Sequence, residues 1–190
     1  MNLQFLAEEY KNCKCCPLHK GRRQVVMGEG NENALLMLVG EGPGADEDRL
    51  GRPFVGRAGK LLDNILDSFN IRRSDIYISN IVKCRPPFNR TPFDEEMFKC
   101  IEILRKQFQI IRPKIIVTLG SSATRALVDK SAKISKIRGK LLERKGVFFI
   151  PTYHPAFLLR NPLKKKEAFE DFKLISKLYL KVLKTEECRS

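Results

Sequence analysis

The sequence predicts an α/β fold in which a central four-stranded, mostly parallel sheet is flanked by helices. Four short apolar runs alternate with stretches of helical periodicity, and three of these runs are almost continuously apolar, as strands covered on both faces are. Strands that alternate with helices favour right-handed crossovers and a parallel sheet. A length of 190 residues favours one compact domain, so we expect a single domain over residues 1–190.

The runs predicted as strands are 34–40 (ALLMLVG), 75–84 (DIYISNIVKC), 114–120 (KIIVTLG) and 146–153 (GVFFIPTY). Helices are predicted where apolar residues recur every three or four positions, which places them at 58–69, 97–108 and 169–182. The last of these is rich in lysine on its other faces. We expect this C-terminal helix and the N-terminal cysteine segment to pack on the same domain.

The composition is strongly basic. Lysine and arginine number 36 against 22 acidic residues, a formal charge of +14. Such a charge attracts polyanions and makes nucleic acid the first partner to consider, with a generic basic surface as the alternative. The N-terminus lacks the pattern of a secretory signal, and no apolar run approaches the roughly 18 residues that span a bilayer. We therefore expect a cytoplasmic monomer without membrane association.

Chemically distinctive residues follow three of the predicted strands, where ligands of parallel sheets bind. The first strand leads into Gly-Glu-Gly-Pro-Gly at 40–44, whose spacing fits neither a dinucleotide fingerprint nor a P-loop. Asn80 lies near the end of the second strand, where its amide needs partners that a base edge would supply. His154 sits between the fourth strand and a proline. Taken singly, each of these features also fits a purely structural role.

The cysteines form a more specific pattern. Cys13 and Cys16 make a C-x-x-C pair, and Cys100 lies on the apolar face of its predicted helix, from which it can meet Cys84 and that pair. Disulfides are not expected in a reducing compartment. Four thiolates suit either zinc or an iron–sulfur cluster, and sulfur chemistry alone does not choose between them. Two cysteines are then left as free thiols, Cys15 and Cys188.

Four segments, together with these cysteines, resemble one family. GEGPG at 40–44, GRPFVGRAG at 51–59, SNIVKCRPP at 79–87 and HPAFLLRNP at 154–162 are similar to the iron–sulfur-containing family 4 uracil-DNA glycosylases. The resemblance implies a monofunctional enzyme that hydrolyses the bond between uracil and deoxyribose in DNA and leaves an abasic site, the first step of base excision repair. The uracil nucleotide would be flipped out of the helix into the cleft.

The resemblance also implies how uracil is bound. Phe54 would stack on the base, Asn80 would bind its N3 and O4 edge, and groups around Gly42 and Pro43 would complete the pocket. A fixed asparagine amide rejects cytosine, which presents the opposite donor and acceptor pattern. How thymine is excluded does not follow from the sequence.

For the chemistry, the resemblance implies that His154 donates a hydrogen bond to O2 of the departing uracil. Glu41 occupies the motif position expected to hold the water or stabilise the sugar cation, with Glu47 in reserve. A structural [4Fe–4S] cluster would be held by the cysteine ligands, and no metal would be needed for the reaction. The implied cluster ligands are Cys13, Cys16, Cys84 and Cys100.

The implied contacts to DNA come from two loops. Arg85 and Arg90 would face phosphates, and Leu158, with Phe157 as second choice, would enter the gap left by the flipped nucleotide beside Arg160. Two alternatives stay open. One is a non-catalytic module that is stabilised by a metal and binds nucleic acid, and the other is a glycosylase of the same fold that acts on another base. The convergence of Glu41, Asn80 and His154 at strand ends favours the enzyme.

Overall fold

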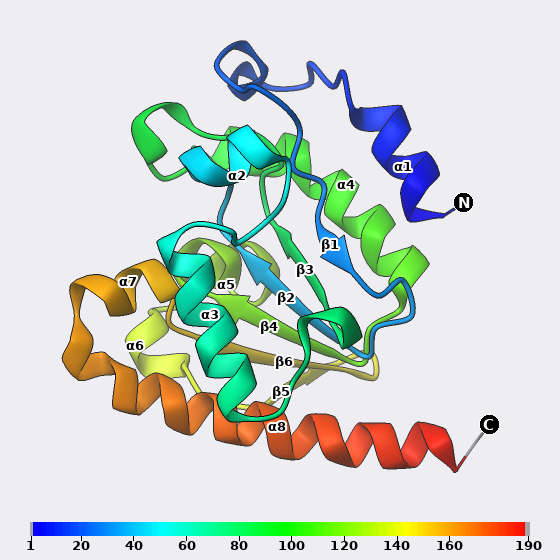
Figure 1. Cartoon of the computed structure of the whole chain (residues 1–190), viewed down its shortest axis with the longest axis vertical. Helices are drawn as coiled ribbons and strands as arrows, with labels where there is room; N and C mark the ends of the chain where they lie inside the picture. The colour runs from blue at the N-terminus through cyan, green and yellow to red at the C-terminus, as the bar shows by residue number, and fades with distance from the viewer. Residues whose placement is uncertain (1, 189–190) are drawn as a thin grey trace.

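A six-stranded sheet forms the centre of the computed structural model, which describes residues 2–188 (Figure 1). The spatial order is β1-β3-β2-β4-β6-β5. The four central strands are parallel to one another, whereas β1 and β5 pair antiparallel at the two edges. The bounds of the strands are β1 Glu29–Gly30, β2 Leu36–Gly40, β3 Tyr77–Asn80, β4 Ile115–Leu119, β5 Leu142–Arg144 and β6 Val147–Thr152.

The four central strands are those predicted from the apolar runs, and the parallel sheet is confirmed. The prediction of four strands in all is wrong, because β1 and β5 extend the sheet at its edges. These strands are only two and three residues long and are mostly half-buried or exposed. Such short, polar segments have no apolar run that a sequence pattern could reveal.

Helices cover both faces of the sheet (Figure 1). One face packs against α1 (Leu3–Tyr10), α4 (Asp94–Ile111) and α5 (Ser121–Leu127), and the other against α3 (Arg57–Ser68) and α8 (Lys165–Glu187). Side chains alternate across a strand, so successive residues of β2 serve the two cores in turn. The three predicted helices are α3, α4 and α8, and the structure confirms each of them.

Shorter helices shape the ends of the sheet. They are α2 (Ala45–Leu50), α6 (Ile134–Ile137), α7 (Pro155–Arg160) and the 3-10 turns η1 (Pro17–Lys20), η2 (Arg73–Asp75), η3 (Pro87–Asn89) and η4 (Pro162–Lys164). Helix α4 begins where Glu96 accepts a hydrogen bond from the Phe93 amide at 2.8 Å, and three acidic residues in its first turn favour the positive end of the helix.

The C-terminal helix is fastened to the strand that precedes the predicted catalytic histidine. Phe172, Ile175 and Tyr179 of α8 are buried, as the periodicity predicts. In addition, the buried Asp171 carboxylate accepts a hydrogen bond from Thr152 Oγ1 in β6 at 2.7 Å and pairs with Arg138. The apolar stripe did not indicate this polar attachment.

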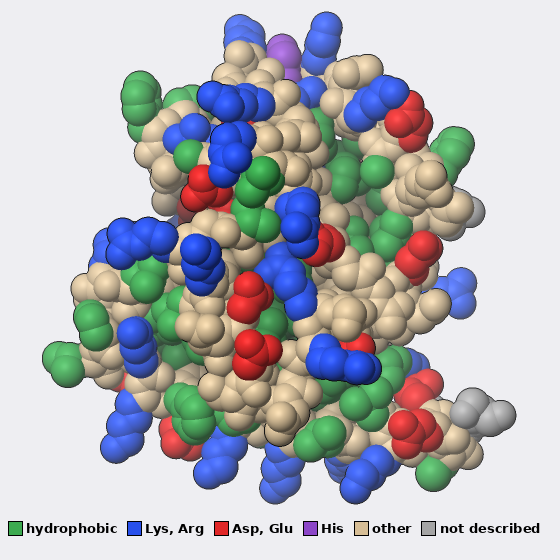
Figure 2. Space-filling model, in the orientation of Figure 1, with side chains coloured by type: hydrophobic (Ala, Val, Ile, Leu, Met, Phe, Trp, Pro, Cys, Tyr) green, Lys and Arg blue, Asp and Glu red, His purple; other side chains and the backbone are tan. Residues whose placement is uncertain are grey.

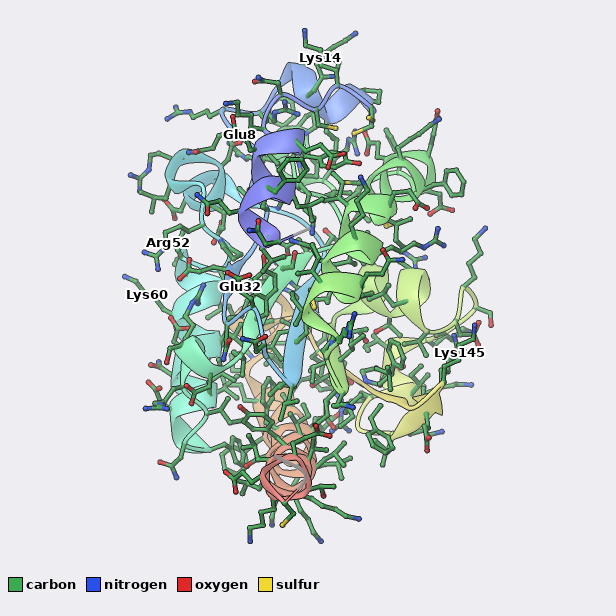
Figure 3. The ribbon with its side chains drawn as sticks, turned by 90° about the vertical axis from the view of Figure 1, so that its right-hand side faces the viewer. Glu8, Lys14, Glu32, Arg52, Lys60 and Lys145 are labelled. Atoms are coloured by element: carbon green, nitrogen blue, oxygen red, sulfur yellow. The ribbon has the colours of Figure 1, made fainter. Side chains whose placement is uncertain are left out.

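Charged side chains spread over the outer surface. Figure 2 shows Lys and Arg side chains over much of one face and along α8. In the perpendicular view of Figure 3, Glu8, Lys14, Arg52, Lys60 and Lys145 lie at the periphery, and all of them are exposed. Among the described residues, no helix is both long enough and apolar enough to cross a bilayer.

Candidate active site

A pocket of about 400 Å³ opens at the carboxyl ends of the four parallel strands. Glu41 follows β2, Asn80 ends β3, Gly120 follows β4 and His154 follows β6, and all four residues line this pocket. Connections from β2 and β4 run to opposite sides of the sheet, which is where open α/β sheets form their ligand crevice. The volume suits one small planar ligand. The structure therefore brings together the residues singled out at three separate strand ends.

Asn80 presents an unpaired acceptor to this pocket. Its side chain is 1% exposed, and Oδ1 has no hydrogen-bond partner within the described part of the chain. A buried carbonyl oxygen without a donor is costly and calls for a ligand that supplies one. The close packing around it requires Gly40, where a Cβ atom would lie 2.4 Å from Asn80 Oδ1 and 2.6 Å from Phe54 Cζ.

Phe54 forms one wall of the pocket. Its ring is 5% exposed and its centroid lies 5.5 Å from that of the His154 ring. The backbone of Phe54 is left-handed, with φ of 51°, which is rare for a bulky residue. Helix α3 passes so close that a Cβ on Gly59 would lie 1.9 Å from the Phe54 carbonyl oxygen. The surrounding contacts therefore fix the position of the ring.

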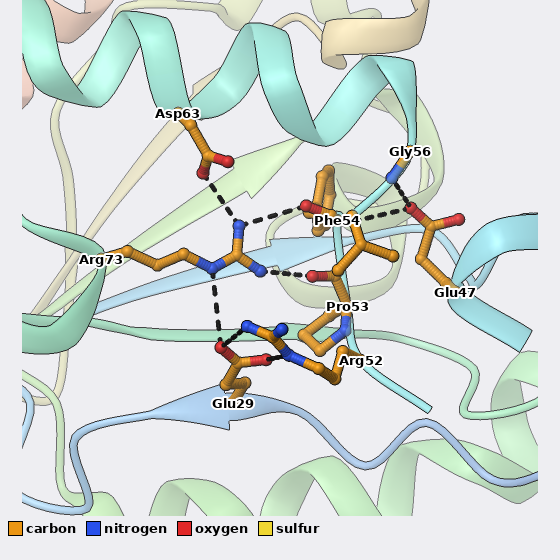
Figure 4. Close-up of polar contacts among 9 residues, drawn as sticks. Glu29, Glu47, Arg52, Pro53, Phe54, Gly56, Asp63 and Arg73 are labelled. Carbon is orange, nitrogen blue, oxygen red and sulfur yellow. Dashed lines mark hydrogen bonds and ion pairs between the residues drawn. The ribbon is translucent and has the colours of Figure 1, made fainter. Parts of the chain in front are cut away.

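Arg73 is the main contact that holds the Phe54 backbone (Figure 4). Its guanidinium donates to the carbonyls of Pro53 and Phe54, and its Nη1 lies 2.9 Å from Asp63 Oδ1. Glu29 approaches the same guanidinium at 3.9 Å. Sequence reasoning missed Arg73, because its role depends on a contact between loops some 20 residues apart.

Glu47 holds the other end of the same loop (Figure 4). Its Oε1 accepts hydrogen bonds from the amides of Val55 and Gly56, both at 2.9 Å, and its Oε2 accepts one from Gly44 at 3.1 Å. Although Glu47 lines the pocket, both of its oxygens are used to shape the backbone. This geometry does not support the prediction of Glu47 as a reserve catalytic carboxylate.

Glu41 also lines the pocket and keeps one carboxylate oxygen without a protein donor among the described residues. Its Oε2 accepts a hydrogen bond from Ser122 Oγ of α5 at 2.5 Å, which fixes the orientation of the carboxylate. Gly42 and Pro43 line the pocket beside it. At Gly42 a Cβ would lie 2.7 Å from Val82, so only glycine fits this turn. Ser122 gave no signal in the sequence, since it has no motif of its own.

His154 is the N-cap residue of α7, and its Nδ1 accepts a hydrogen bond from the Ala156 amide at 3.1 Å. This contact leaves the imidazole proton on Nε2. Burial, followed by the nearby positive charge of Arg160, lowers the pKa of His154 to about 4. The ring is therefore neutral at pH 7. Gly120 allows its close approach, because a Cβ there would lie 2.9 Å from the Cβ of His154.

Helix α7 corrects one prediction about the DNA contact. Leu158 is fully buried and packs with Tyr153 and Ala168, so the expectation that it projects from the surface is wrong. The segment forms a helix instead of a loop, and that helix turns Leu158 into the core. Phe157 is half-buried and its ring stacks on Tyr153, with centroids 4.9 Å apart. Arg160 is exposed at the pocket edge.

The loop between β3 and α4 forms another edge of the pocket. Arg85 Nε donates to Asn89 Oδ1 at 2.8 Å, and Asn89 lines the pocket. Arg90 makes two hydrogen bonds with Glu96, at 2.7 and 2.8 Å, and its guanidinium lies 3.9 Å above the centre of the Phe93 ring. Arg90 thus ties the loop to α4, and a phosphate would have to share it with Glu96. Asn89 was not recognised from the sequence.

The four predicted cysteine ligands line a single small cavity, together with Cys15. No group of three or more His, Cys, Asp or Glu residues between residues 2 and 188 is arranged to hold a metal ion as it stands. The donor chemistry nevertheless fits a cluster, because the cavity gathers soft sulfur atoms and hydrogen-bond donors to them. Arg22 Nη1 lies 3.1 Å from Cys84 Sγ, and the Lys83 amide lies 3.3 Å from Cys100 Sγ.

Burial raises the pKa of one thiol in this cavity, and the neighbouring Lys83 is buried as well. It raises the pKa of the Cys100 thiol to about 12, so this sulfur stays protonated unless a cation binds it. Lys83 is fully buried, and its Nζ donates to Ser79 Oγ, the Asn80 carbonyl and Gln107 Oε1, at 2.6 to 2.8 Å. One lysine thus connects the strand end that carries Asn80 with the wall of the cysteine cavity.

Fold and site define an α/β protein with a pocket at the ends of four parallel strands, lined by an aromatic ring, an amide, a carboxylate and an imidazole. Residues 27–173 match the uracil DNA glycosylase superfamily. The chain belongs to this superfamily and, within it, to the type-4 enzymes, which confirms the resemblance drawn from the motifs.

Several relatives support this assignment. A type-4 uracil-DNA glycosylase of Thermotoga maritima is 50% identical over 161 residues, which cover 84% of each chain. A type-4 enzyme of Pyrobaculum aerophilum is 44% identical and covers 90% of this chain and 91% of its own. A type-5 uracil-DNA glycosylase of the same organism is 33% identical over 149 residues, 70% of this chain and 66% of its own.

Proposed function

We propose that the protein hydrolyses the N-glycosidic bond between uracil and deoxyribose in DNA and leaves an abasic site, the first step of base excision repair. The observation that carries this proposal is the buried, unpaired Oδ1 of Asn80 in a pocket walled by Phe54 and His154. Family membership supports the same reaction.

Recognition follows from the fixed amide. Uracil would stack on Phe54 and place its N3–H donor against Asn80 Oδ1, while the amide nitrogen donates to O4. Cytosine offers an acceptor at N3 and a donor at C4, which leaves buried polar groups of both partners unpaired. The rejection of cytosine therefore rests on the orientation of the Asn80 amide.

Bond cleavage places negative charge on the departing base. His154 would donate its Nε2–H to uracil O2 and stabilise the anion without giving up the proton. A neutral imidazole suits this task, because it needs no titration to be ready at pH 7. Loss of one such donor costs about 10²–10³ in rate.

Positive charge develops on the sugar, and a water molecule must attack it at C1′. Glu41, oriented by Ser122, would stabilise that charge and direct the water. Asn89 lines the same pocket and is the second polar side chain able to orient a water molecule. Glu47 would support the reaction indirectly, through the loop that carries Phe54.

The cysteine cavity would hold a [4Fe–4S] cluster on Cys13, Cys16, Cys84 and Cys100. When bound, the cluster supplies a structural crosslink and takes no part in hydrolysis. It would join the N-terminal segment to the loop after β3 and to α4. Arg22 would then donate to a ligand sulfur, the kind of contact that tunes such clusters.

Contacts to DNA would come from the pocket edge. Arg160 lines that edge at the end of α7, and Arg85 lies in the loop after β3, where it donates to the pocket-lining Asn89. The formal charge of +14 adds a general attraction for the phosphate backbone. Arg90 would contribute chiefly by fixing the loop, given its ion pair with Glu96.

The test is a glycosylase assay on a labelled oligonucleotide with one uracil, run in EDTA and followed by alkaline cleavage of abasic sites. We expect cleavage at uracil in single- and double-stranded DNA, none in a matched thymine oligonucleotide, and a loss of about 10²–10³ in His154→Ala. A folded, brown protein that binds the oligonucleotide without cleaving it would support the non-catalytic alternative. Cleavage at another base would support the second alternative, a glycosylase of the same fold that acts on another base.

A further inference from the structure

Phe88 is the most exposed large apolar side chain among residues 2–188. It is 99% exposed, although a phenylalanine gains free energy whenever its ring is removed from water. It occupies the centre of η3, in the loop between β3 and α4. An aromatic ring left wholly in water at the edge of an active site calls for a partner that covers it.

The loop holds Phe88 in a costly conformation. Its φ of 55° and ψ of 22° are left-handed, and Asn89 follows with φ of 56°. For a bulky residue such as Phe88 this conformation costs roughly 1–2 kcal/mol, whereas asparagine adopts it more readily. Contacts on both sides keep the turn in place: the Asn89 amide donates to Pro86 at 3.1 Å, and Arg85 donates to the Asn89 side chain at 2.8 Å. Strain of this kind persists mainly at functional sites.

Phe88 lies at the rim of the active-site pocket. Pro86, Asn89 and Arg90, on both sides of it in the chain, line the pocket, whereas Phe88 itself points to solvent. The loop that contains η3 stands out from the body of the molecule beside α2 (Figure 1). DNA whose uracil occupies the pocket must therefore pass close to this ring.

Within residues 2–188, the other apolar side chains near this rim are held by contacts of their own. Leu158 belongs to the core, and Phe157 stacks on Tyr153. Phe93 faces the Arg90 guanidinium, and Phe98 is exposed on α4, at a separate surface groove. Enzymes that flip a nucleotide commonly fill or flank the gap with an apolar or aromatic side chain. Phe88 is the ring that the structure leaves available for this purpose.

We propose that Phe88 stacks on a base that becomes exposed when the uracil nucleotide leaves the duplex. The inference rests on the proposed function and deepens it. The stacked ring offsets part of the cost of unstacking, and the left-handed turn holds it ready before DNA binds. Since a single strand has little stacking to break, the contribution of Phe88 is specific to double-stranded substrates.

The test compares single-turnover uracil excision from matched double-stranded and single-stranded oligonucleotides. Phe88→Ala is expected to lower the duplex rate roughly 5- to 100-fold, the range of aromatic stacking on a base, and to leave the single-strand rate unchanged. Phe88→Tyr keeps the ring and is expected to retain the duplex rate. Phe98→Ala, which removes another exposed ring, serves as the matched control and should change neither rate.

A second readout is the fluorescence of a base analogue placed opposite uracil, measured in the His154→Ala background so that the substrate persists. We expect binding of the protein to the DNA to enhance this fluorescence, and we expect the enhancement to disappear when Phe88→Ala is added. An unchanged duplex rate, or an equal loss on both substrates, would overturn the role of Phe88. If the wild-type protein excised uracil from neither substrate, the proposed function itself would fail, and this inference with it.

Discussion

Arg73 donates a hydrogen bond to the backbone carbonyl of Phe54 at 3.1 Å, and it holds the ring proposed to stack on uracil without itself lining the pocket. The same guanidinium reaches Pro53 and Asp63. Because Phe54 has a left-handed backbone, it would relax toward another conformation without these contacts. Arg73 is therefore a positioning residue for base recognition.

Arg73→Ala should weaken uracil recognition. We expect kcat/KM to fall roughly tenfold, mainly through KM, and the free energy of unfolding to fall by about 2 kcal/mol as charged hydrogen bonds are lost. Arg73→Lys keeps the charge but carries its donors on a single nitrogen, which cannot span the acceptors that the two guanidinium Nη atoms reach, so it should recover part of both. Steady-state kinetics and chemical denaturation measure these effects.

The control for this prediction is the neighbouring arginine. Arg72 pairs with Asp75 on the surface, and its side chain is 79% exposed. Arg72→Ala should therefore leave KM unchanged. Equal effects of the two substitutions would contradict a specific role for Arg73.

Substitution of the two pocket glutamates should affect different properties, the rate of the chemical step for Glu41 and the melting temperature for Glu47. Glu41→Gln should lower the rate of the chemical step with little change in melting temperature, because the proposed role of Glu41 is to act on the sugar and the water. Glu47→Gln should lower the melting temperature, since a glutamine cannot accept from three backbone amides through both of its terminal atoms. Single-turnover rates and thermal unfolding separate the two.

Asn89→Ala completes this comparison. If it slows the chemical step more than Glu41→Gln does, the water is oriented from the loop after β3. In that case Glu41 would serve mainly to shape the pocket.

The pH dependence should reflect a neutral His154. Its pKa is lowered to about 4, so excision should show no inflection near pH 6.5 that depends on this residue. The free energy of unfolding should also depend on pH through this histidine. Between pH 6.5 and 4 the unfolded chain binds a proton that the folded histidine does not, so stability falls as pH decreases through this window.

Chemical denaturation at several pH values, compared with His154→Gln, tests this prediction. The variant should show a shallower loss of stability between pH 6.5 and 4. An inflection in the activity of the wild-type protein near pH 6.5, absent from the variant, would show that a charged imidazole takes part.

The cluster ligands should be distinguishable from the nearby spare thiol. Cys84→Ala should abolish the brown absorbance, reduce iron content and lower stability. Cys15→Ser should retain the cluster, although Cys15 lines the same cavity. Iron analysis of the two purified variants measures this. A loss of iron in the Cys15 variant alone would identify Cys15, and not Cys84, as a cluster ligand.

Binding to DNA should depend on salt through Arg160. Arg160→Ala is expected to reduce the slope of log affinity against log salt by about 0.9 on duplex DNA, the value for one phosphate contact. Arg90→Ala should instead lower stability, since its partner Glu96 has a side chain that is only 4% exposed. Binding titrations at several salt concentrations test the first effect. An unchanged slope would place Arg160 outside the DNA contact.

Sequence patterns predicted the features of this fold that depend on local chemistry. Three of the four buried parallel strands are almost continuously apolar, and β2, β3, β4 and β6 were all found from short apolar runs that alternate with helical patterns. Their carboxyl ends share one edge of the sheet, which brought Glu41, Asn80 and His154 together as predicted.

Features that depend on contacts between distant segments did not follow from the sequence. Arg73, Ser122 and Asp171 give no motif, and their roles appear only when the loops and helices they bind are in place. For Leu158, by contrast, a motif was present and led to the prediction that this side chain enters the DNA. The helix that begins after His154 buries this side chain, and periodicity over six residues is too short to reveal it.

The attachment of α8 to β6 links the last helix to the strand that leads into the pocket. Asp171 binds Thr152 two residues before His154, and it also neutralises Arg138. Shortening the chain before α8 would leave the half-buried Arg138 guanidinium without its carboxylate partners and expose the sheet face beneath the helix. The last helix, which carries no glycosylase motif, is thus expected to help hold His154 in place.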